Sequence, residues 1–173
     1  SMEIIREGVP MTVELELNTT LHDLTLVHNK IYDLPPEYFI YGGAVFMPLT
    51  LNYLESWGSE WYLNAVDYMS YPMIFDNWRT QDRDEFVVLT FMLPGEVNTG
   101  YETLQNEIIE TVDGVAVRNF TQFVDLVEGG TGEFLLLTTN LDNIIVLDRA
   151  AAEAANRGIM ARYGIASDRV LLP

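Results

Sequence analysis

The side chains that most often carry out chemistry are scarce in this sequence. It contains two histidines, His22 and His28, and no cysteine, which excludes disulfides, thiolate zinc sites and cysteine nucleophiles. Their spacing of six residues, in a polar stretch, does not place both imidazoles on one face of a helix or of a strand. We therefore expect linker histidines rather than a metal site or an acid/base pair.

A serine nucleophile is not indicated either. Serine hydrolases commonly place the nucleophile in a sharp turn such as G-x-S-x-G, with an oriented base beside it. No serine has such flanking glycines; the serines are Ser1, Ser56, Ser59, Ser70 and Ser167. The densest charged loop mixes both signs, as solvated loops do; it holds Arg79, Asp82, Arg83, Asp84 and Glu85. The sequence predicts no catalytic residue, no metal and no cofactor.

The composition bounds the class of protein. The 173 residues are 49% hydrophobic and 20% charged, which is enough apolar material for a sizeable core. Nine Lys and Arg stand against 26 Asp and Glu, so the formal net charge is −17. Such a surface repels phosphate backbones and anionic lipids, and no apolar stretch approaches the ~20 residues of a membrane-spanning helix. We expect neither nucleic acid nor a membrane as a partner, and the compartment stays open.

The first 17 residues predict a β-hairpin. Val13, Leu15 and Leu17 alternate with polar residues, which is the pattern of a half-buried strand, and Gly8 supplies the turn. An isolated hairpin is marginal in water, so it must pack on the rest of the chain or belong to another domain.

Residues 18–37 are interpreted as a linker, because they are polar and end in two prolines that disfavour helix and central strand. The main domain then covers 38–173. It opens with an uncharged stretch in which two apolar runs flank Gly42-Gly43, predicting a strand, a tight loop with exposed amides, and a second strand.

The remaining elements follow from periodicity and turn residues. Between Leu51 and Trp78 an aromatic-rich segment predicts two helices, Leu51–Trp57 and Glu60–Met69, the second ended by Pro72. The expected strands are Phe86–Leu93, Glu107–Val112, Val115–Val117, Phe134–Thr138 and Asn143–Leu147. The expected helices are one capped by Asn119 with apolar positions Phe120, Phe123, Val124 and Val127, and an Ala-rich one at Arg149–Tyr163 capped by Asp148.

This order of parts resembles a known family. Ile108–Leu147, with its Val-Asp-Gly turn before a helix and a hairpin after it, is similar to the second half of the circularly permuted PDZ domains of HtrA/Deg serine proteases. Further motifs look like the last PDZ domain of plant-type Deg proteases and their bacterial relatives: Tyr38–Thr50, Trp57-Gly58, Val97–Tyr101, and Val146–Ile165 with Asp168-Arg169. The resemblance covers Tyr38–Leu172.

The resemblance implies an α+β fold: a PDZ-like, partly open β-barrel or sandwich with a groove helix, an aromatic helical insert and a C-terminal helix. It also implies that residues 1–17 are the closing hairpin of a preceding PDZ domain. A trypsin-like domain with a His-Asp-Ser triad lies upstream in that family, so any peptidase activity belongs to the parent protein and not to this segment.

The resemblance further implies a peptide-binding site. In PDZ domains, successive backbone N–H groups of a Gly-containing loop hold the ligand's C-terminus, and the ligand adds as a strand beside a groove helix. Carried over, the loop is Tyr41–Ala44, the strand Ala44–Leu49 and the helix Asn119–Val127. The implied peptide-binding residues are Tyr41, Gly42, Gly43, Ala44, Val45, Phe46, Phe120, Phe123, Val124 and Val127.

Three departures favour a second interpretation. Gly42 replaces the usual apolar loop residue, Pro48 offers no N–H to an added strand, and no Lys or Arg lies between Ile31 and Trp78. Gly42-Gly43 then forms only a tight turn beneath a core, and the module serves assembly with an occluded groove.

The aromatic insert also has two interpretations. Its side chains pack as the lid of an enlarged core, or Trp57, Trp61 and Tyr62 form an exposed interface for another subunit. The resemblance favours the interface, because it implies a homo-oligomeric parent protease. The expected partners are accordingly peptide or protein segments and neighbouring subunits.

Overall fold

The chain folds around an eight-stranded sheet, flanked by helices, in a computed structural model that describes residues 1–14, 16 and 18–172. The strands run in the order β10-β3-β4-β5-β6-β8-β9, and β7 pairs with β6. Their bounds are β3 Tyr38–Tyr41, β4 Ala44–Pro48, β5 Val87–Met92, β6 Glu107–Val112, β7 Val115–Ala116, β8 Phe134–Thr139, β9 Ile144–Asp148 and β10 Arg169–Val170. The sheet does not close into a barrel, and the expected α+β, PDZ-like class is confirmed.

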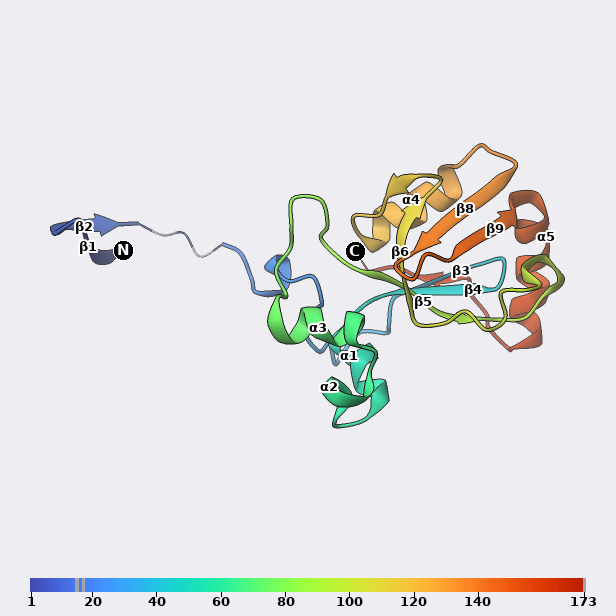
Figure 1. Cartoon of the computed structure of the whole chain (residues 1–173), viewed down its shortest axis with the longest axis horizontal. Coiled ribbons are helices and arrows are strands. Elements are labelled where there is room, and N and C mark those ends of the chain that lie inside the picture. Colours follow the sequence, from blue (N-terminus) through green and yellow to red (C-terminus); the bar gives the residue numbers. More distant parts are fainter. Residues whose placement is uncertain (15, 17, 173) are drawn as a thin grey trace.

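Helices cover the sheet and extend from one end of it (Figure 1). The α-helices are α1 Leu51–Leu54, α2 Trp61–Asn64, α3 Asp67–Phe75, α4 Phe120–Gly129 and α5 Arg149–Arg162. Short 3-10 turns are η1 His22–Leu24, η2 Glu55–Trp57 and η3 Glu96–Asn98. No helix in the described part of the chain is both long and apolar enough to span a bilayer.

Helix α4 packs its apolar face against the sheet. Asn119 caps it, because its side-chain oxygen accepts the Gln122 N–H at 2.8 Å. The four residues on the packed face are all buried and follow the helical repeat; they are Phe120, Phe123, Val124 and Val127. They meet Phe46 and inward residues of β5, β6, β8 and β9 in the main hydrophobic core.

Arg149 supports the other end of α4. Its guanidinium, which is buried, donates to the Val127 carbonyl and forms an ion pair with Asp113. A cation near the last carbonyls of a helix is favourable. Asp148, whose side chain accepts the Ala151 N–H at 2.9 Å, starts α5 next to this contact as the sequence predicts.

The aromatic insert forms a separate small core. Val27, Leu49, Leu54, Ala65, Met69 and Val88 are its buried members. Tyr53 and Tyr68 fasten the insert to the sheet, since their hydroxyls donate to the side chain and the carbonyl of Asn106 at 2.6 and 2.7 Å. Burial raises the pKa of Tyr53 to about 12, so it stays a hydrogen-bond donor at any physiological pH.

The helices of the insert differ from the prediction for Glu60–Met69. The backbone is extended at Ala65 and Val66, which divides the segment into α2 and α3. Helix α3 then continues to Phe75 with Pro72 inside it. Proline costs one backbone hydrogen bond here but does not stop the helix, because the burial of Met69 and Ser70 holds the preceding turn.

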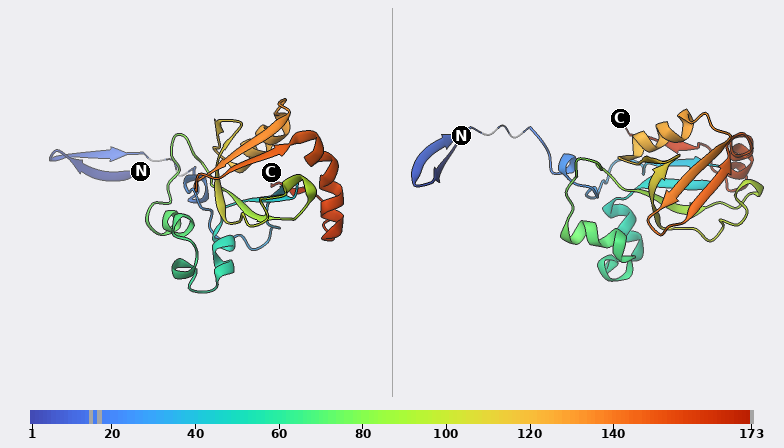
Figure 2. Two further views of the ribbon diagram at one scale, coloured as in Figure 1. Left: turned by 45° about the vertical axis from the view of Figure 1, so that its right-hand side comes forward. Right: turned by 45° about the horizontal axis from the view of Figure 1, so that its top comes forward.

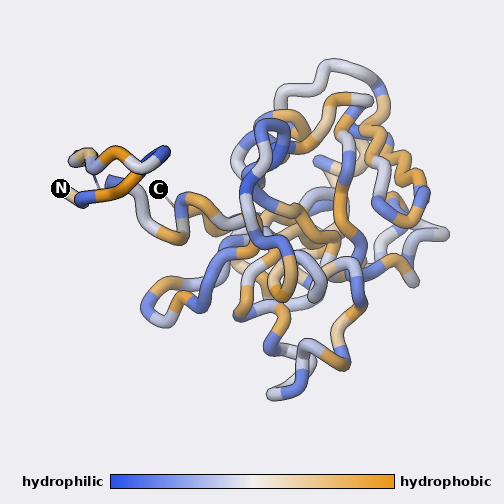
Figure 3. Tube along the Cα trace, turned by 60° about the vertical axis from the view of Figure 1, so that its left-hand side comes forward, coloured by the Kyte–Doolittle hydropathy of each residue, from blue (hydrophilic) through white to orange (hydrophobic). Residues whose placement is uncertain are grey.

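The N-terminal hairpin is present and stands apart from the domain (Figures 1 and 2). Strands β1 Met2–Arg6 and β2 Val9–Val13 pair with each other around Glu7-Gly8. Leu15 and Leu17, which the sequence adds to this strand pattern, lie outside the described residues. The hairpin carries hydrophobic stretches although it does not touch the main core (Figure 3). Its assignment to a preceding PDZ domain stays a prediction.

The segment expected to be a linker is partly built into the fold. Thr25 bridges to Trp78 and His28 to Thr50, and Leu26, Val27 and His28 are buried. Val27 is a buried member of the insert's core, so polar composition alone does not show that this segment packs onto the fold.

Gly43 and Gly114 provide a matched test of this packing. Both occupy the second position of a two-residue turn, with φ of +87° and +82°. An added Cβ would lie 2.4 Å from the Leu93 carbonyl at Gly43 but meets nothing within 4 Å at Gly114. We expect Gly114→Ala to lower the free energy of unfolding by about 1 kcal/mol, from backbone strain alone. Gly43→Ala should cost about 3 kcal/mol or more in urea denaturation, because a clash is added; equal losses would contradict the close packing.

Candidate peptide-binding site

Strand β4, which should receive the added peptide, has partners on both edges. On one side Phe46, Val45 and Ala44 pair with β3. On the other side Ala44–Pro48 pairs with β5 from Met92 to Val87. Strand addition requires an unpaired edge. In this structure a peptide can add beside Ala44–Phe46 on the first of these sides only after β3 has left.

The loop at Gly42-Gly43 is a tight turn beneath helix α5. Tyr41 and Ala44 pair directly across it, as in a two-residue hairpin with positive φ at both central residues. An added Cβ on Gly42 would lie 3.0 Å from the Ala152 Cβ of α5. The Asn98 amide donates to the Gly42 carbonyl at 2.7 Å, and this asparagine is fully buried. The turn is therefore filled by the chain itself where a carboxylate cradle was expected.

The residues expected to line the ligand pocket do come together, but inside the core. Phe46, Phe120, Phe123, Val124 and Val127 are each 2% exposed or less. The rings of Phe46 and Phe123 have their centroids 4.7 Å apart. The ring of Phe39, on β3, meets the Phe123 ring edge to face, with 6.4 Å between their centroids. Strand β3 thus supplies the side chain that fills the space where a ligand residue would sit.

The other expected peptide-binding residues lie at the margin of this core. Val45 is half-buried against Ile40, Leu93 and Ile159. Tyr41 is buried, and its hydroxyl donates to the Arg149 carbonyl at 3.3 Å. It also borders a cavity of about 290 Å³ beside α5 and β10, lined in addition by Phe39, Ile40, Glu128, Glu153, Asn156, Asp168 and Arg169.

The three residues expected at an interface differ in exposure, although the rings of Trp61 and Tyr62 meet edge to face with 6.0 Å between their centroids. Trp57 and Trp61 are half-buried against the small core of the insert, whereas Tyr62 is 49% exposed. The exposed aromatic residues lie further along, on α3 and just after it: Tyr71 at 58%, Phe75 at 70% and Trp78 at 57%. The rings of Tyr71 and Phe75 are in contact, with 4.6 Å between their centroids and a tilt of 38°. Their spacing of four residues places both side chains on one face of a helix. The prediction that the helix ends at Pro72 excludes this arrangement.

The charged loop before β5 is largely paired, contrary to the solvated loop that the sequence predicts. Arg83 pairs with Glu110 at 2.5 Å and Asp84 with Arg118 at 2.6 Å. Arg118 holds the pKa of Asp84 below its usual value by hydrogen bonding. The loop therefore fastens the start of α4 to the sheet.

Glu85 lies deepest in this loop. Its Oε2 accepts the Phe120 N–H at 2.9 Å, which satisfies the exposed start of α4. Its Oε1 lies 3.3 Å from His28 Nε2, and Arg79 Nη2 lies 3.2 Å from the same nitrogen. Burial raises the pKa of Glu85. His28 is therefore a buried structural residue and not a linker residue.

Comparison with known proteins places this geometry in a family. A model described as "PDZ domain" matches residues 27–170. This chain belongs to the PDZ domain family. The match starts at Val27, where the chain enters the insert's core, and it ends at β10.

Relatives of this PDZ chain are Deg-type proteases, which confirms the resemblance drawn from the sequence. "Putative protease Do-like 12, mitochondrial" of Arabidopsis thaliana is 26% identical over 96% of this chain, and "Protease Do-like 2, chloroplastic" of the same plant is 28% identical over 96%. "Serine protease DegP homolog" of Plasmodium falciparum is 32% identical over 60%. The chain spans 29%, 26% and 11% of the length of these proteins. A PDZ domain in such proteins supports a role as a protein-interaction module.

Phe123 decides between a core and an open groove in this PDZ domain. In the structure it is fully buried, so Phe123→Ala should lower the free energy of unfolding by about 3–5 kcal/mol, as large-to-small core changes do. The matched control is Phe134→Ala, at a residue of β8 that is 50% exposed. This change should lower the free energy of unfolding by less than about 1 kcal/mol. Denaturation curves that show similar small losses for both variants would indicate an open pocket around Phe123.

The Asp84–Arg118 pair predicts a pH dependence. Because the folded-state pKa of Asp84 is lowered, the pair stabilises the fold above the ordinary value of 3.8, and this contribution disappears as the pH falls through the folded-state pKa. Asp84→Asn should therefore lower stability by less than about 1 kcal/mol at neutral pH, since Arg118 is half-exposed. The difference from the unmodified chain should vanish in acid. Asp82→Asn controls for the change in net charge, and a difference that persists in acid would contradict the assignment.

Proposed function

We propose that this chain is a non-catalytic PDZ module of a Deg-type serine protease and that it acts through contacts with adjacent protein, in the first place neighbouring subunits. The observation that carries the proposal is the combination of a filled groove with an exposed aromatic surface. We call the exposed side chains Tyr71, Ile74, Phe75 and Trp78 the α3 surface. Clustered exposed aromatics are typical of interfaces.

The proposal extends what the relatives' names say to this chain. Three of them are named as proteases, and the chain matches only a fraction of their length, consistent with a segment that carries no catalysis. Peptidase activity is therefore proposed for the parent protein and assembly or regulation for this module. The interface expected at Trp57, Trp61 and Tyr62 is accordingly moved to the α3 surface, with Tyr62 as a neighbour.

Peptide capture by strand addition is the second candidate, supported by the family match. It requires β3 to leave, which would expose Phe39, Ile40 and Tyr41. At about 2 kcal/mol for each buried side chain the opening costs about 6 kcal/mol. That penalty weakens the apparent affinity by about 10⁴-fold. Assembly through the α3 surface is thus the function that the geometry supports best.

Self-association of the chain tests the proposal. A Tyr71→Ser/Phe75→Ser double variant removes this pair of contacting rings at little cost to stability, because both side chains are more than half exposed. Analytical ultracentrifugation should show concentration-dependent oligomers for the unmodified chain and a monomer for the double variant. Phe134→Ser, also a half-exposed aromatic, should leave the oligomers unchanged.

A titration with peptides ending in a free carboxylate tests the second candidate. Fluorescence polarisation should show no saturable binding at high micromolar concentration, because the turn and β4 are occupied. A monomer at every concentration together with tight peptide binding would reverse the order of the two functions.

A further inference from the structure

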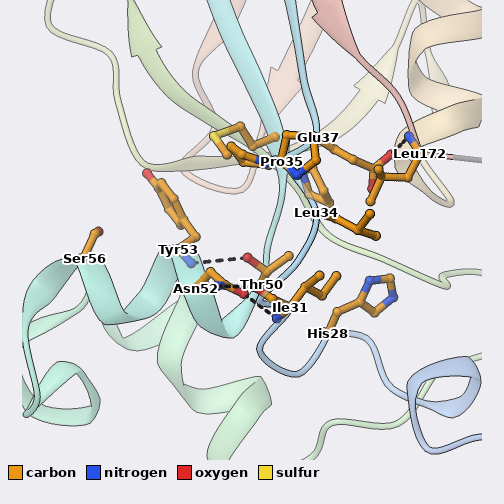
Figure 4. Close-up of a pocket in the computed structure, with 13 residues that line it drawn as sticks. His28, Ile31, Leu34, Pro35, Glu37, Thr50, Asn52, Tyr53, Ser56 and Leu172 are labelled. Carbon is orange, nitrogen blue, oxygen red and sulfur yellow. Dashed lines mark hydrogen bonds between the residues drawn. The ribbon is translucent and has the colours of Figure 1, made fainter.

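A cavity of about 310 Å³ lies at the other end of β4 from the Gly42-Gly43 turn (Figure 4). We call it the α1 cavity. One wall is the segment His28–Glu37, the opposite wall is α1, and Met47, Pro48 and Leu172 complete it. It is separate from the conventional groove, since none of the ten residues expected to bind peptide lines it.

The walls of the α1 cavity are held in place without a ligand. The Asn52 side chain accepts the Ile31 N–H at 2.9 Å and donates to the Ile31 carbonyl at 3.0 Å, which fastens the two walls together (Figure 4). The Leu51 N–H donates to the His28 carbonyl at 2.9 Å. Thr50 caps α1 by accepting the Tyr53 N–H at 3.2 Å. A site that is already formed loses less entropy when it binds.

The size and lining suit one large apolar side chain. Ligand sites in proteins begin at about 300 Å³ and are mostly apolar with a few polar groups. The apolar lining residues are Ile31, Leu34, Pro35, Pro36, Met47, Pro48 and Leu172. Leu34 is 53% exposed, so it stands at an accessible edge of the cavity.

The charge of the lining residues indicates which charge the ligand should carry. Glu37, His28 and Tyr53 are the ionisable residues among those that line the α1 cavity. His28 Nε2 is engaged by Glu85 and Arg79, whereas Glu37 accepts the Leu172 N–H at 2.9 Å and forms no ion pair within the described residues. Lys30 forms an ion pair with Glu55, and its ammonium group lies over the Tyr32 ring. With no Lys or Arg among the described lining residues and a net charge of −17, a ligand carboxylate is disfavoured and a basic group is favoured.

We infer that the α1 cavity binds an internal segment of a partner protein in which an aromatic or large aliphatic side chain enters the cavity and an adjacent Lys or Arg pairs with Glu37. This inference rests on the proposed role as an interaction module and names a partner chemistry for it. It differs from recognition of a C-terminal carboxylate, because the ligand is cationic and needs no free chain end.

Capped peptides provide the test. The probe is a seven-residue peptide, acetylated and amidated, with a Phe-Arg pair between Gly and Ser residues; its relatives carry Ala for Phe, Gln for Arg, or a free C-terminal carboxylate. We expect the Phe-Arg peptide to bind, with amide shifts in NMR spectra of the whole chain at Glu37, Thr50 and Leu172. Each change in the peptide should weaken binding by about tenfold, and added salt should weaken it further.

Two variants with matched controls assign the binding to the cavity. Glu37→Gln keeps an acceptor for the Leu172 N–H but removes the charge, and it should abolish the preference for Arg over Gln in the peptide. Leu34→Ser should weaken the Phe-Arg peptide by about fivefold without unfolding the chain. Glu133→Gln and Leu141→Ser, at exposed positions away from the cavity, should change neither.

The inference is overturned if the capped peptides do not bind, if their shifts map to Ala44–Pro48 and α4, or if Glu37→Gln leaves the preference for arginine intact. These results are independent of the oligomers formed through the α3 surface. Persisting oligomers with no peptide binding reject the cavity alone, whereas a monomeric chain that still binds the Phe-Arg peptide rejects assembly alone.

Discussion

The absence of a free edge on β4 is the constraint on which the rest of this structure depends. Strand β3 pairs with Ala44–Phe46 on one side of β4 and brings Phe39 against Phe123, so α4 packs onto a sheet in which β4 is an inner strand. The turn between β3 and β4 then lies under α5, where Ala152 and Asn98 fill its surroundings. The recognition surfaces that we propose accordingly lie elsewhere, at the end of the sheet and on the helical insert.

Much of the fold could be predicted from the sequence because its local signals agree with its packing. The limits of β6 and the cap of α4 at Asn119 follow from alternation and capping chemistry. The division between α2 and α3 could not be predicted, since it depends on extended backbone at Ala65, which the small core of the insert buries. Tertiary burial overrides helix propensity there.

The candidate site shows a different limit. The family resemblance groups Phe46, Phe120 and Phe123, and the structure places the rings of Phe46 and Phe120 beside that of Phe123. Whether such residues line a groove or a core depends on a third element, here Phe39 on β3, and on the edge at which β3 pairs. Pairing between strands is non-local information, so apolar periodicity alone does not determine it.

Charge and apolar contacts have different roles on this acidic surface. The cations are largely used in internal pairs, such as Arg83 with Glu110 and Arg169 with Glu128. The net charge of −17 favours basic partners over about one Debye length, ~8–10 Å at physiological salt. In our proposal, aromatic and aliphatic contacts at the insert add the short-range selectivity.

The short strand β10 has a consequence for how the newly made chain folds. It covers the outer edge of β3 by pairing Arg169 with Phe39, and Tyr38 reaches the Ser167 carbonyl across 129 residues of sequence. During synthesis this edge stays unprotected until nearly the whole domain has left the ribosome. Contacts of such high sequence separation fold slowly. In newly made chains the edge of β3 is therefore open to mispairing until β10 covers it.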